Sequence, residues 1–280
     1  FDYNDIDSLE DLFDKYRNQI AAVMLEPATS IVPKPYDDDE LDFLPISKKR
    51  KNHFLNQIRS LCTKNNSLLI IDEMITGFRW DNLGAANYFD IKADLITFGK
   101  GIANGFSLSA LGGKKEIMEL GSTSVKGKER VFLLSTTHGA EMGSLGAFIK
   151  TLEIYEKKPV VENIWSYGKK LKLKCNEISK NLGLEDYFYF YGPGISLNFI
   201  TNNLQKENCL KFRTLFAQEM IKNKVIMPYI AVSFSHKKRE LYLTLEAVEK
   251  SLKVYKKALD SDIDNFLDGP NILPVFRKFN

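Results

Sequence analysis

The sequence is poor in cysteine and histidine, and it holds no long hydrophobic run. Its 280 residues include three histidines and three widely spaced cysteines, Cys62, Cys175 and Cys209. An odd number of distant cysteines predicts neither a disulfide framework nor a zinc site, and it favours a reducing, cytoplasmic compartment. No apolar run approaches the roughly 18 residues that a membrane span needs. We therefore expect neither a bound metal nor a membrane partner.

A marked excess of one charge is also missing. The 39 basic and 36 acidic side chains leave a net charge of +3, which is too small and too scattered to indicate a nucleic-acid partner. The densest basic run, Lys48-Lys49-Arg50-Lys51, is typical of a solvated loop or a helix start. Hydrophobic residues make up 44% of the chain, as in an ordinary globular protein.

Short apolar segments dominate the first half of the chain. Continuous apolar runs of this kind predict parallel strands that are covered on both faces. They are expected at 20–25, 68–71 and 94–98, with further strands at 107–113 and 131–134 and with helices at 7–19, 54–65 and 114–120. Strands that alternate with helices predict an α/β layer with a largely parallel sheet.

The second half of the chain has a different pattern. Long helical stretches are expected at 145–154, 164–182, 211–222 and 237–259, a strand-rich part at 187–200 and an extended part at 225–234. This mixture predicts an α+β domain. We place the domains at 1–155 and 156–280, and we expect the Pro- and Gly-punctuated tail after residue 259 to wrap the surface.

An acid and an amine follow two of the predicted strands. Asp72 ends the second apolar run, and Lys100 ends the third, between Gly99 and Gly101. Ligands of open α/β sheets lie beyond the carboxyl ends of the strands, so the two side chains are expected to converge on one crevice. Alone, the lysine would indicate a surface turn and the acid a strand end. Together they are the pair that a pyridoxal-phosphate enzyme needs: a lysine for the Schiff base and a carboxylate for the pyridine nitrogen.

The surrounding residues form a recognised pattern. The segments 70–79 (IIDEMITGFR) and 94–105 (DLITFGKGIANG) resemble the cofactor-attachment signature of the class III aminotransferases. Thr76 to Arg79 is most similar to the members that resemble glutamate-1-semialdehyde 2,1-aminomutase. The segment 21–27 (AAVMLEP) is similar to the strand that precedes the cofactor site in this family. The resemblance implies that Lys100 is the catalytic, cofactor-bonding residue and that Asp72 binds the cofactor.

A third block resembles the phosphate-contacting segment of the family. In 135–139 (STTHG), the resemblance gives Thr137 the role of reaching the cofactor phosphate of the neighbouring subunit. The sequence then departs from the commonest family pattern, since it has Ala140 and Glu141 where Gly-Asn is common. This departure leaves the substrate open, with amino-sugar precursors and tetrapyrrole precursors as alternatives.

The resemblance implies the pyridoxal-phosphate-dependent transferase fold type I: a partial large α/β domain followed by a small C-terminal α+β domain. It further implies a homodimer that uses pyridoxal 5'-phosphate with a small-molecule amino donor and acceptor. The reaction would be either amino transfer or the migration of an amino group within one molecule. Glu26 and Arg79 are possible neighbours of the site without an assigned role, and His236 is expected to be structural.

The chain resembles the C-terminal two-thirds of a family member. Family members carry an upstream region with a phosphate-binding loop, and the glycine turns at 99–101 and 192–194 do not suit that task. We therefore expect this part of the protein to bind the cofactor poorly by itself. The alternative interpretation is a non-catalytic, dimerising fragment with the same scaffold.

Overall fold

The structure is a computed structural model that describes residues 1–36, 52–127, 129, 131, 139 and 141–273. The chain divides into two compact units, Phe1–Glu162 and Asn163–Asn280. The domain boundary expected after residue 155 falls inside helix α6 (Met142–Lys157).

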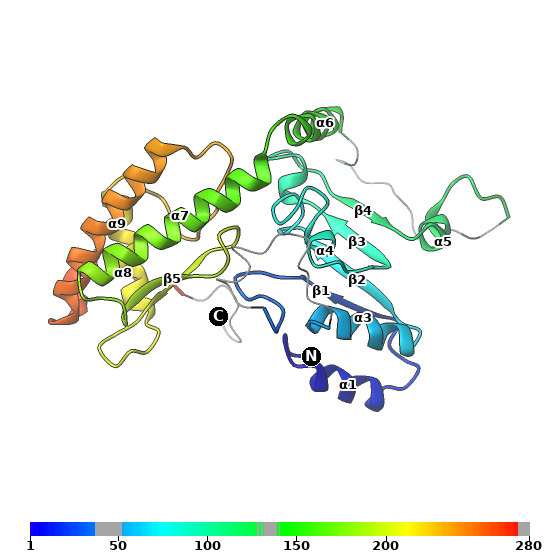
Figure 1. Cartoon of the computed structure of the whole chain (residues 1–280), viewed down its shortest axis with the longest axis horizontal. Coiled ribbons are helices and arrows are strands. Elements are labelled where there is room, and N and C mark those ends of the chain that lie inside the picture. Colours follow the sequence, from blue (N-terminus) through cyan, green and yellow to red (C-terminus); the bar gives the residue numbers. More distant parts are fainter. Residues whose placement is uncertain (37–51, 128, 130, 132–138, 140, 274–280) are drawn as a thin grey trace. The chain divides into compact units, whose positions relative to one another are not determined.

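The first unit is built on a four-stranded sheet (Figure 1). Its strands, in spatial order, are β1 (Ala22–Leu25), β2 (Leu68–Glu73), β3 (Leu95–Phe98) and β4 (Ala110–Gly113). β1, β2 and β3 run parallel, as the apolar runs predicted, and β4 is antiparallel to β3. The reversal follows from a short connection, which holds the 3-10 helix η2 (Lys100–Ile102) and lacks the crossover helix that a parallel neighbour needs. Of the strand expected at 131–134, only Val131 lies within the described residues.

Two amphipathic helices supply much of the core of this unit. α3 (Phe54–Lys64) buries Phe54, Leu55, Ile58 and Cys62, the helical repeat seen in the sequence. α1 (Ile6–Lys15) buries Leu9 and Phe13 and lies beside α3, which in turn contacts β2 (Figure 1). The remaining helices of the sheet region are short: α4 (Ala85–Tyr88), α5 (Lys115–Met118) and η3 (Glu119–Gly121).

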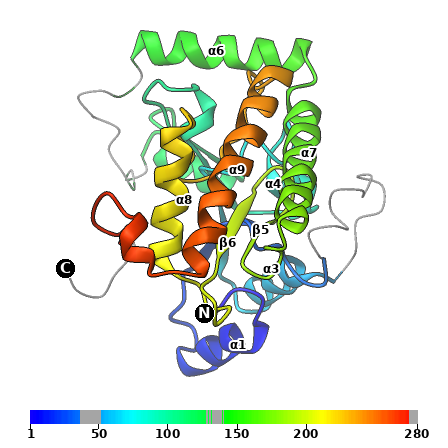
Figure 2. The same ribbon diagram turned by 90° about the vertical axis from the view of Figure 1, so that its left-hand side faces the viewer.

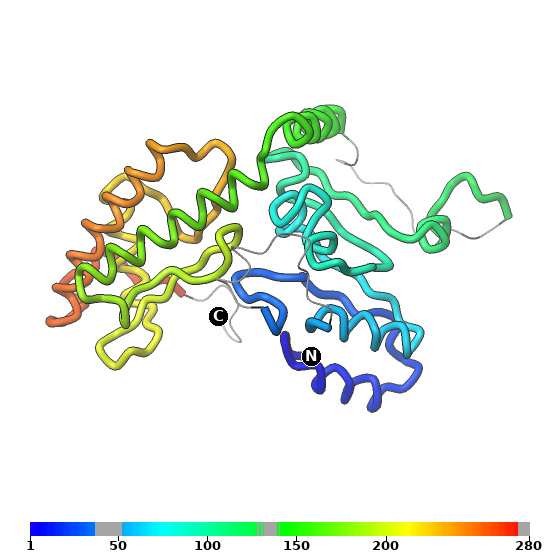
Figure 3. The backbone as a smooth tube through the Cα atoms, viewed as in Figure 1, coloured from blue at the N-terminus to red at the C-terminus, as the bar shows by residue number. Residues whose placement is uncertain are grey.

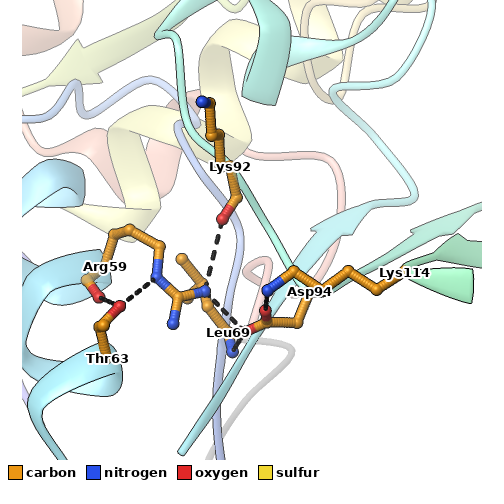
Figure 4. A network of polar contacts seen from close by, with 6 residues as sticks. All are labelled: Arg59, Thr63, Leu69, Lys92, Asp94 and Lys114. Carbon is orange, nitrogen blue, oxygen red and sulfur yellow. Dashed lines mark hydrogen bonds and ion pairs between the residues drawn. The ribbon is translucent and has the colours of Figure 1, made fainter. Parts of the chain in front are cut away.

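A buried carboxylate ties this sheet to its flanking helix (Figure 4). Asp94, whose side chain is 4% exposed, lies 2.6 Å from Arg59 Nη1 on α3 and 2.6 Å from Lys114 Nζ. The backbone N–H of Leu69 on β2 donates a third hydrogen bond to Asp94 Oδ2, also 2.6 Å long. Burial by itself would raise the pKa of Asp94, but these hydrogen bonds outweigh it and lower the pKa to about 2. Asp94 is therefore ionised and structural.

The second unit packs three long helices on a β-hairpin. β5 (Phe188–Tyr191) and β6 (Asn198–Thr201) pair antiparallel, while α8 (Leu210–Lys222) and α9 (Lys238–Leu259) lie side by side (Figure 2). α7 (Val160–Asn181) leads into this unit. Its core is an aromatic cluster of Phe188, Phe190, Phe199, Phe212, Phe216 and Tyr255.

The tail and the segment before α9 are irregular. Residues 225–234 were expected to be extended, but they form no strand because no neighbouring strand pairs with them in the part of the chain that the structure describes. The tail contains the 3-10 helix η4 (Ile263–Phe266), which contacts α8. Lys211 Nζ on α8 lies 2.6 Å from Asp264 Oδ1 on η4. Within the described residues, no helix is long and apolar enough to cross a membrane.

Candidate active site

Polar side chains line up at the carboxyl ends of the three parallel strands. The register pairs Leu25 with Ile71 and Asp72 with Thr97, so that Glu26, Asp72 and Thr97 follow one another across the strand ends. Thr97 Oγ1 donates a hydrogen bond of 3.2 Å to Asp72 Oδ1, and the Met74 N–H donates one of 2.9 Å to the same oxygen. The Asp72 carboxylate is half-buried and is held in one orientation by these two donors.

Lys100 follows β3 on a strained turn. Its φ is +42°, in the left-handed region that non-glycine residues seldom adopt and that is common at functional sites. The side chain is exposed. A Cβ at Gly101 would meet no atom within 4 Å, whereas a Cβ at Gly99 would collide with the Met74 side chain. The backbone before Lys100 is thus tightly packed, and the space after it is open.

Electrostatic interactions connect Glu26 with both predicted site residues. Burial raises the pKa of Glu26, the Asp72 carboxylate raises it further, and the Lys100 ammonium opposes both effects. Two carboxylates and one amine therefore share the end of the sheet. Glu26 was expected from the sequence as a possible neighbour of the site. In the structure it lies next to Asp72, because Leu25 pairs with Ile71 in the register.

Consecutive residues at the end of β2 have different surroundings. Asp72 is half-buried and lies in the row with Glu26 and Thr97, whereas Glu73 is buried, with 1% of its surface exposed. Successive side chains of a strand point to opposite faces, which explains the difference. Glu73 accepts hydrogen bonds from Thr76 Oγ1 (2.6 Å) and from the N–H groups of Ala85 (2.9 Å) and Ala86 (2.7 Å). Of the two carboxylates, Asp72 is the one that contacts Thr97 at the strand ends.

The remaining candidate residues from the sequence do not belong to the row at the strand ends within the part of the chain that the structure describes. Arg79 is half-buried, and its charge lowers the pKa of Tyr155, although burial is the larger influence and raises it. Glu141 is exposed at the start of α6. His236 in the second unit accepts a 3.3 Å hydrogen bond from the Ser233 N–H and packs against a tyrosine ring, a structural arrangement. Thr137 and His138 lie outside the described residues.

Two site features were not found from the sequence. Thr97 was read only as part of a strand, and Glu73 only as the neighbour of Asp72. The available signal for Thr97 was its place three positions before Lys100 in an otherwise apolar strand. Among the described residues, no group of three or more His, Cys, Asp or Glu side chains could hold a metal ion. The chemistry of the strand ends is therefore that of carboxylates, a hydroxyl and an amine.

Comparison with known proteins gives the same family as the residue pattern. Residues 3–186 match the model of the family "Aminotransferase class-III". Over 265 residues the chain is 31% identical to the glutamate-1-semialdehyde 2,1-aminomutase of Alkaliphilus oremlandii, covering 91% of this chain and 58% of that protein. It is 30% identical over 270 residues to the 3-aminobutyryl-CoA aminotransferase of Cloacimonas acidaminovorans, covering 92% and 58%.

A solved structure supports the fold. The FumI protein of Sphingopyxis sp. MTA144 superposes with a TM-score of 0.74 at 23% identity, over 93% of this chain and 58% of that one. The expected pyridoxal-phosphate-dependent transferase fold type I is confirmed. The chain belongs to the class III aminotransferase family. It spans 58% of the length of the first curated relative.

Proposed function

We propose that this chain is the cofactor-bonding part of a pyridoxal-phosphate-dependent aminotransferase or aminomutase, with Lys100 as the residue that bonds the cofactor. The observation that carries the proposal is the row at the strand ends. There, Thr97 at the end of β3 orients Asp72 at the end of β2, and Lys100 follows Thr97 by three residues. A carboxylate and an exposed amine at adjacent parallel strands are the groups that this chemistry requires.

The residues present fit the cofactor. Open space lies beside Gly101, directly after Lys100, where a flat ring can approach the backbone. The half-buried Asp72 can hold a proton on the pyridine nitrogen, since the Met74 N–H and the Thr97 hydroxyl both donate to Oδ1 and not to Oδ2. Pyridoxal phosphate, when bound, supplies an electron sink that stabilises a carbanion on the amino-bearing carbon of the substrate.

Lys100 has two tasks in this proposal. Its Nζ would hold the cofactor through the aldehyde carbon, with loss of water, and would be displaced when the substrate amine takes its place. The free Nζ would then move the proton to and from the substrate carbon. The Lys100 side chain is exposed, so it can change its conformation for this transfer. Glu26 stands close enough to Lys100 for their charges to interact, and we assign it no proton transfer.

Three further parts of the proposal rest on the family resemblance or on chemistry alone. Thr137 would contact the cofactor phosphate of a neighbouring subunit, and the protein would be a homodimer. Exposed apolar side chains on α6, among them Met142 and Ile149, are consistent with a partner surface. The unpaired thiols of Cys62, Cys175 and Cys209 support a cytoplasmic location, where thiols stay reduced.

The test is a borohydride reduction of the longest natural form of the protein mixed with pyridoxal phosphate, followed by peptide mass spectrometry. We expect the reduced pyridoxyl group on Lys100, together with a visible absorbance band that is absent in Lys100→Ala. Lys115→Ala, which changes an exposed lysine of the same unit, should retain both signals. A protein with no band and no labelled Lys100 would instead be the non-catalytic scaffold.

The choice between transfer and internal migration needs product analysis. The relatives include an aminomutase and an aminotransferase, so both reactions remain within the proposal. Incubation with a 15N-labelled amino donor and an unlabelled oxo acid distinguishes them. Label that passes to the second molecule indicates an aminotransferase, and label that reappears on the adjacent carbon of the donor indicates an aminomutase.

A further inference from the structure

We propose that Glu73 is a positioning residue for Lys100, acting through the loop 74–84, which it holds against the segment that carries the lysine. This inference rests on the proposed function for the role of Lys100 and adds a residue that has no contact with the cofactor side of the sheet. The chain leaves β2, passes through this loop and α4, and returns to β3 (Figure 3).

Glu73 closes the loop at both ends. Its Oε2 accepts from Thr76 Oγ1 (2.6 Å) near the start and from the Ala85 N–H (2.9 Å) at the end, and its Oε1 accepts from the Ala86 N–H (2.7 Å). Its backbone carbonyl accepts from the Gly77 N–H (2.9 Å). At 1% exposure, the carboxylate has no water to replace these donors, so the closed loop depends on them.

The closed loop packs directly on the residues before Lys100. The Phe78 ring lies 5.7 Å from the Phe98 ring, centroid to centroid, and a Cβ at Gly77 would come within 2.8 Å of Phe98 Cδ1. Met74 packs over Gly99, so that any side chain at position 99 would have to displace the end of the Met74 side chain. The two residues that precede Lys100 are thus both covered by the loop.

A second contact keeps Phe78 in place from the other side. Tyr155 on α6 donates a hydrogen bond of 2.7 Å to the Phe78 carbonyl, and the two rings lie 5.8 Å apart in an edge-to-face arrangement. Phe78 has a φ of +61°, a conformation that a phenylalanine adopts only when its surroundings impose it. The loop therefore acts as a rigid link between Glu73 and the strained turn at Lys100.

Glu73→Gln tests the link at constant side-chain volume. The amide has one acceptor oxygen, so its NH2 group must face the N–H of Ala85 or Ala86, and at least one buried bond is lost. Amide hydrogen exchange of the full chain without cofactor then measures the result. We expect exchange about tenfold faster at Ala85 and Ala86 and also at Ile102, whose N–H bonds the Gly99 carbonyl.

Two other variants separate the link from general loss of stability. Phe78→Leu removes the ring contact with Phe98 and leaves the Glu73 bonds intact, so it should speed exchange at Ile102 and not at Ala86. Cys62→Ala creates a cavity under α3 in the same unit, outside the loop, and should speed neither relative to the rest of the unit. The proposal would be overturned if Glu73→Gln speeds exchange at Ala85 and Ala86 while Ile102 exchanges as in the parent. It would also be overturned if Cys62→Ala speeds exchange at Ala85, Ala86 and Ile102 as Glu73→Gln is expected to do.

Cofactor trapping supplies the functional readout. With pyridoxal phosphate and borohydride, Glu73→Gln and Phe78→Leu should each reduce labelling of Lys100 about tenfold, at a cofactor concentration that half-labels the parent protein. Unchanged labelling in both variants would overturn the positioning role. If the parent protein itself shows no labelled Lys100, the proposed function fails, while the exchange measurements still decide whether Glu73 controls the turn.

Discussion

The hydroxyl of Thr97 on β3 donates a hydrogen bond of 3.2 Å to Oδ1 of Asp72 on β2. The two residues are direct partners in the parallel register, so the contact is a consequence of strand pairing. It joins the strand that ends at the predicted acid to the strand that ends at the predicted lysine.

Replacing Thr97 by valine keeps the side-chain volume and removes this donor. If Asp72 holds the cofactor nitrogen, its carboxylate becomes less well oriented, and we expect pyridoxal phosphate to bind about three- to tenfold more weakly, as for the loss of one hydrogen bond of about 1 kcal/mol. Absorbance titration with the cofactor measures the affinity. Thr151→Val on α6, which removes a hydroxyl bonded within its own helix, is the control and should leave the affinity unchanged.

Asp94 makes a prediction about acid stability. Its pKa is about 2 in the folded chain, against an ordinary value of 3.8, so the unfolded chain binds more protons between these values. The stabilisation is therefore complete above pH 4 and is lost as the pH falls toward 2. Asp94→Asn should cost roughly 3 kcal/mol at neutral pH, because Arg59 loses its buried partner, and should remove this part of the acid transition.

The matched control for Asp94 is an exposed ion pair. Lys206 Nζ lies 2.7 Å from Asp186 Oδ2, with both side chains about 60% exposed (59% and 60%). Because solvent screens such a pair, Asp186→Asn should have little effect on the free energy of unfolding. Urea unfolding of both variants between pH 7 and pH 3 provides the measurement. Equal losses in the two variants would show that Asp94 is not a structural anchor.

His53 predicts a second pH effect, at milder acidity. The ring is fully buried, and Nε2 donates to the Phe89 carbonyl at 3.0 Å, while Nδ1 has no hydrogen-bond partner among the described residues. Burial lowers the pKa of His53, and the Phe89 carbonyl and Asp90 oppose this only partly. The unfolded chain therefore binds the proton first, and stability should fall as the pH drops below about 6.5, by at most about 1.4 kcal/mol per pH unit.

His53→Gln tests this effect, since glutamine can donate to the same carbonyl and does not titrate. We expect its unfolding free energy to be flatter between pH 7 and pH 5 than that of the parent. His236→Gln, which changes a half-buried histidine of the second unit, should keep the parent slope. An identical slope in the parent and in His53→Gln would contradict the assignment.

Two glycines with positive φ differ in their surroundings. Gly84 (φ +91°) lies where a Cβ would come within 2.6 Å of Glu73 Oε1, whereas a Cβ at Gly183 (φ +70°) would meet nothing within 4 Å. Gly183→Ala should cost about 1 kcal/mol of conformational strain, and Gly84→Ala roughly 2–4 kcal/mol because it also displaces the buried carboxylate. Trp80 and Trp165 fluorescence reports the unfolding of the first and the second unit. Equal losses would mean that Glu73 moves aside without cost.

The sequence alone determined most of the elements and led to the prediction of two central site residues. Apolar runs of four to six residues and helical repeats are local signals, so β1, β2, β3, α3, α8 and α9 lie close to their expected positions. Asp72 and Lys100 were predicted as site residues because each ends such a run within a family pattern. The same reasoning could not give the direction of β4, which depends on what its connection to β3 contains.

Tertiary structure decided which groups meet. The row of Glu26, Asp72 and Thr97 exists because of the register between strands that are distant in sequence, and no local pattern specifies a register. The different surroundings of Asp72 and Glu73 follow from the face of the sheet that each one meets, although both are acids at a strand end. Local propensity therefore placed the chemistry along the chain, and long-range packing determined which carboxylate faces the site and which holds the loop beside Lys100.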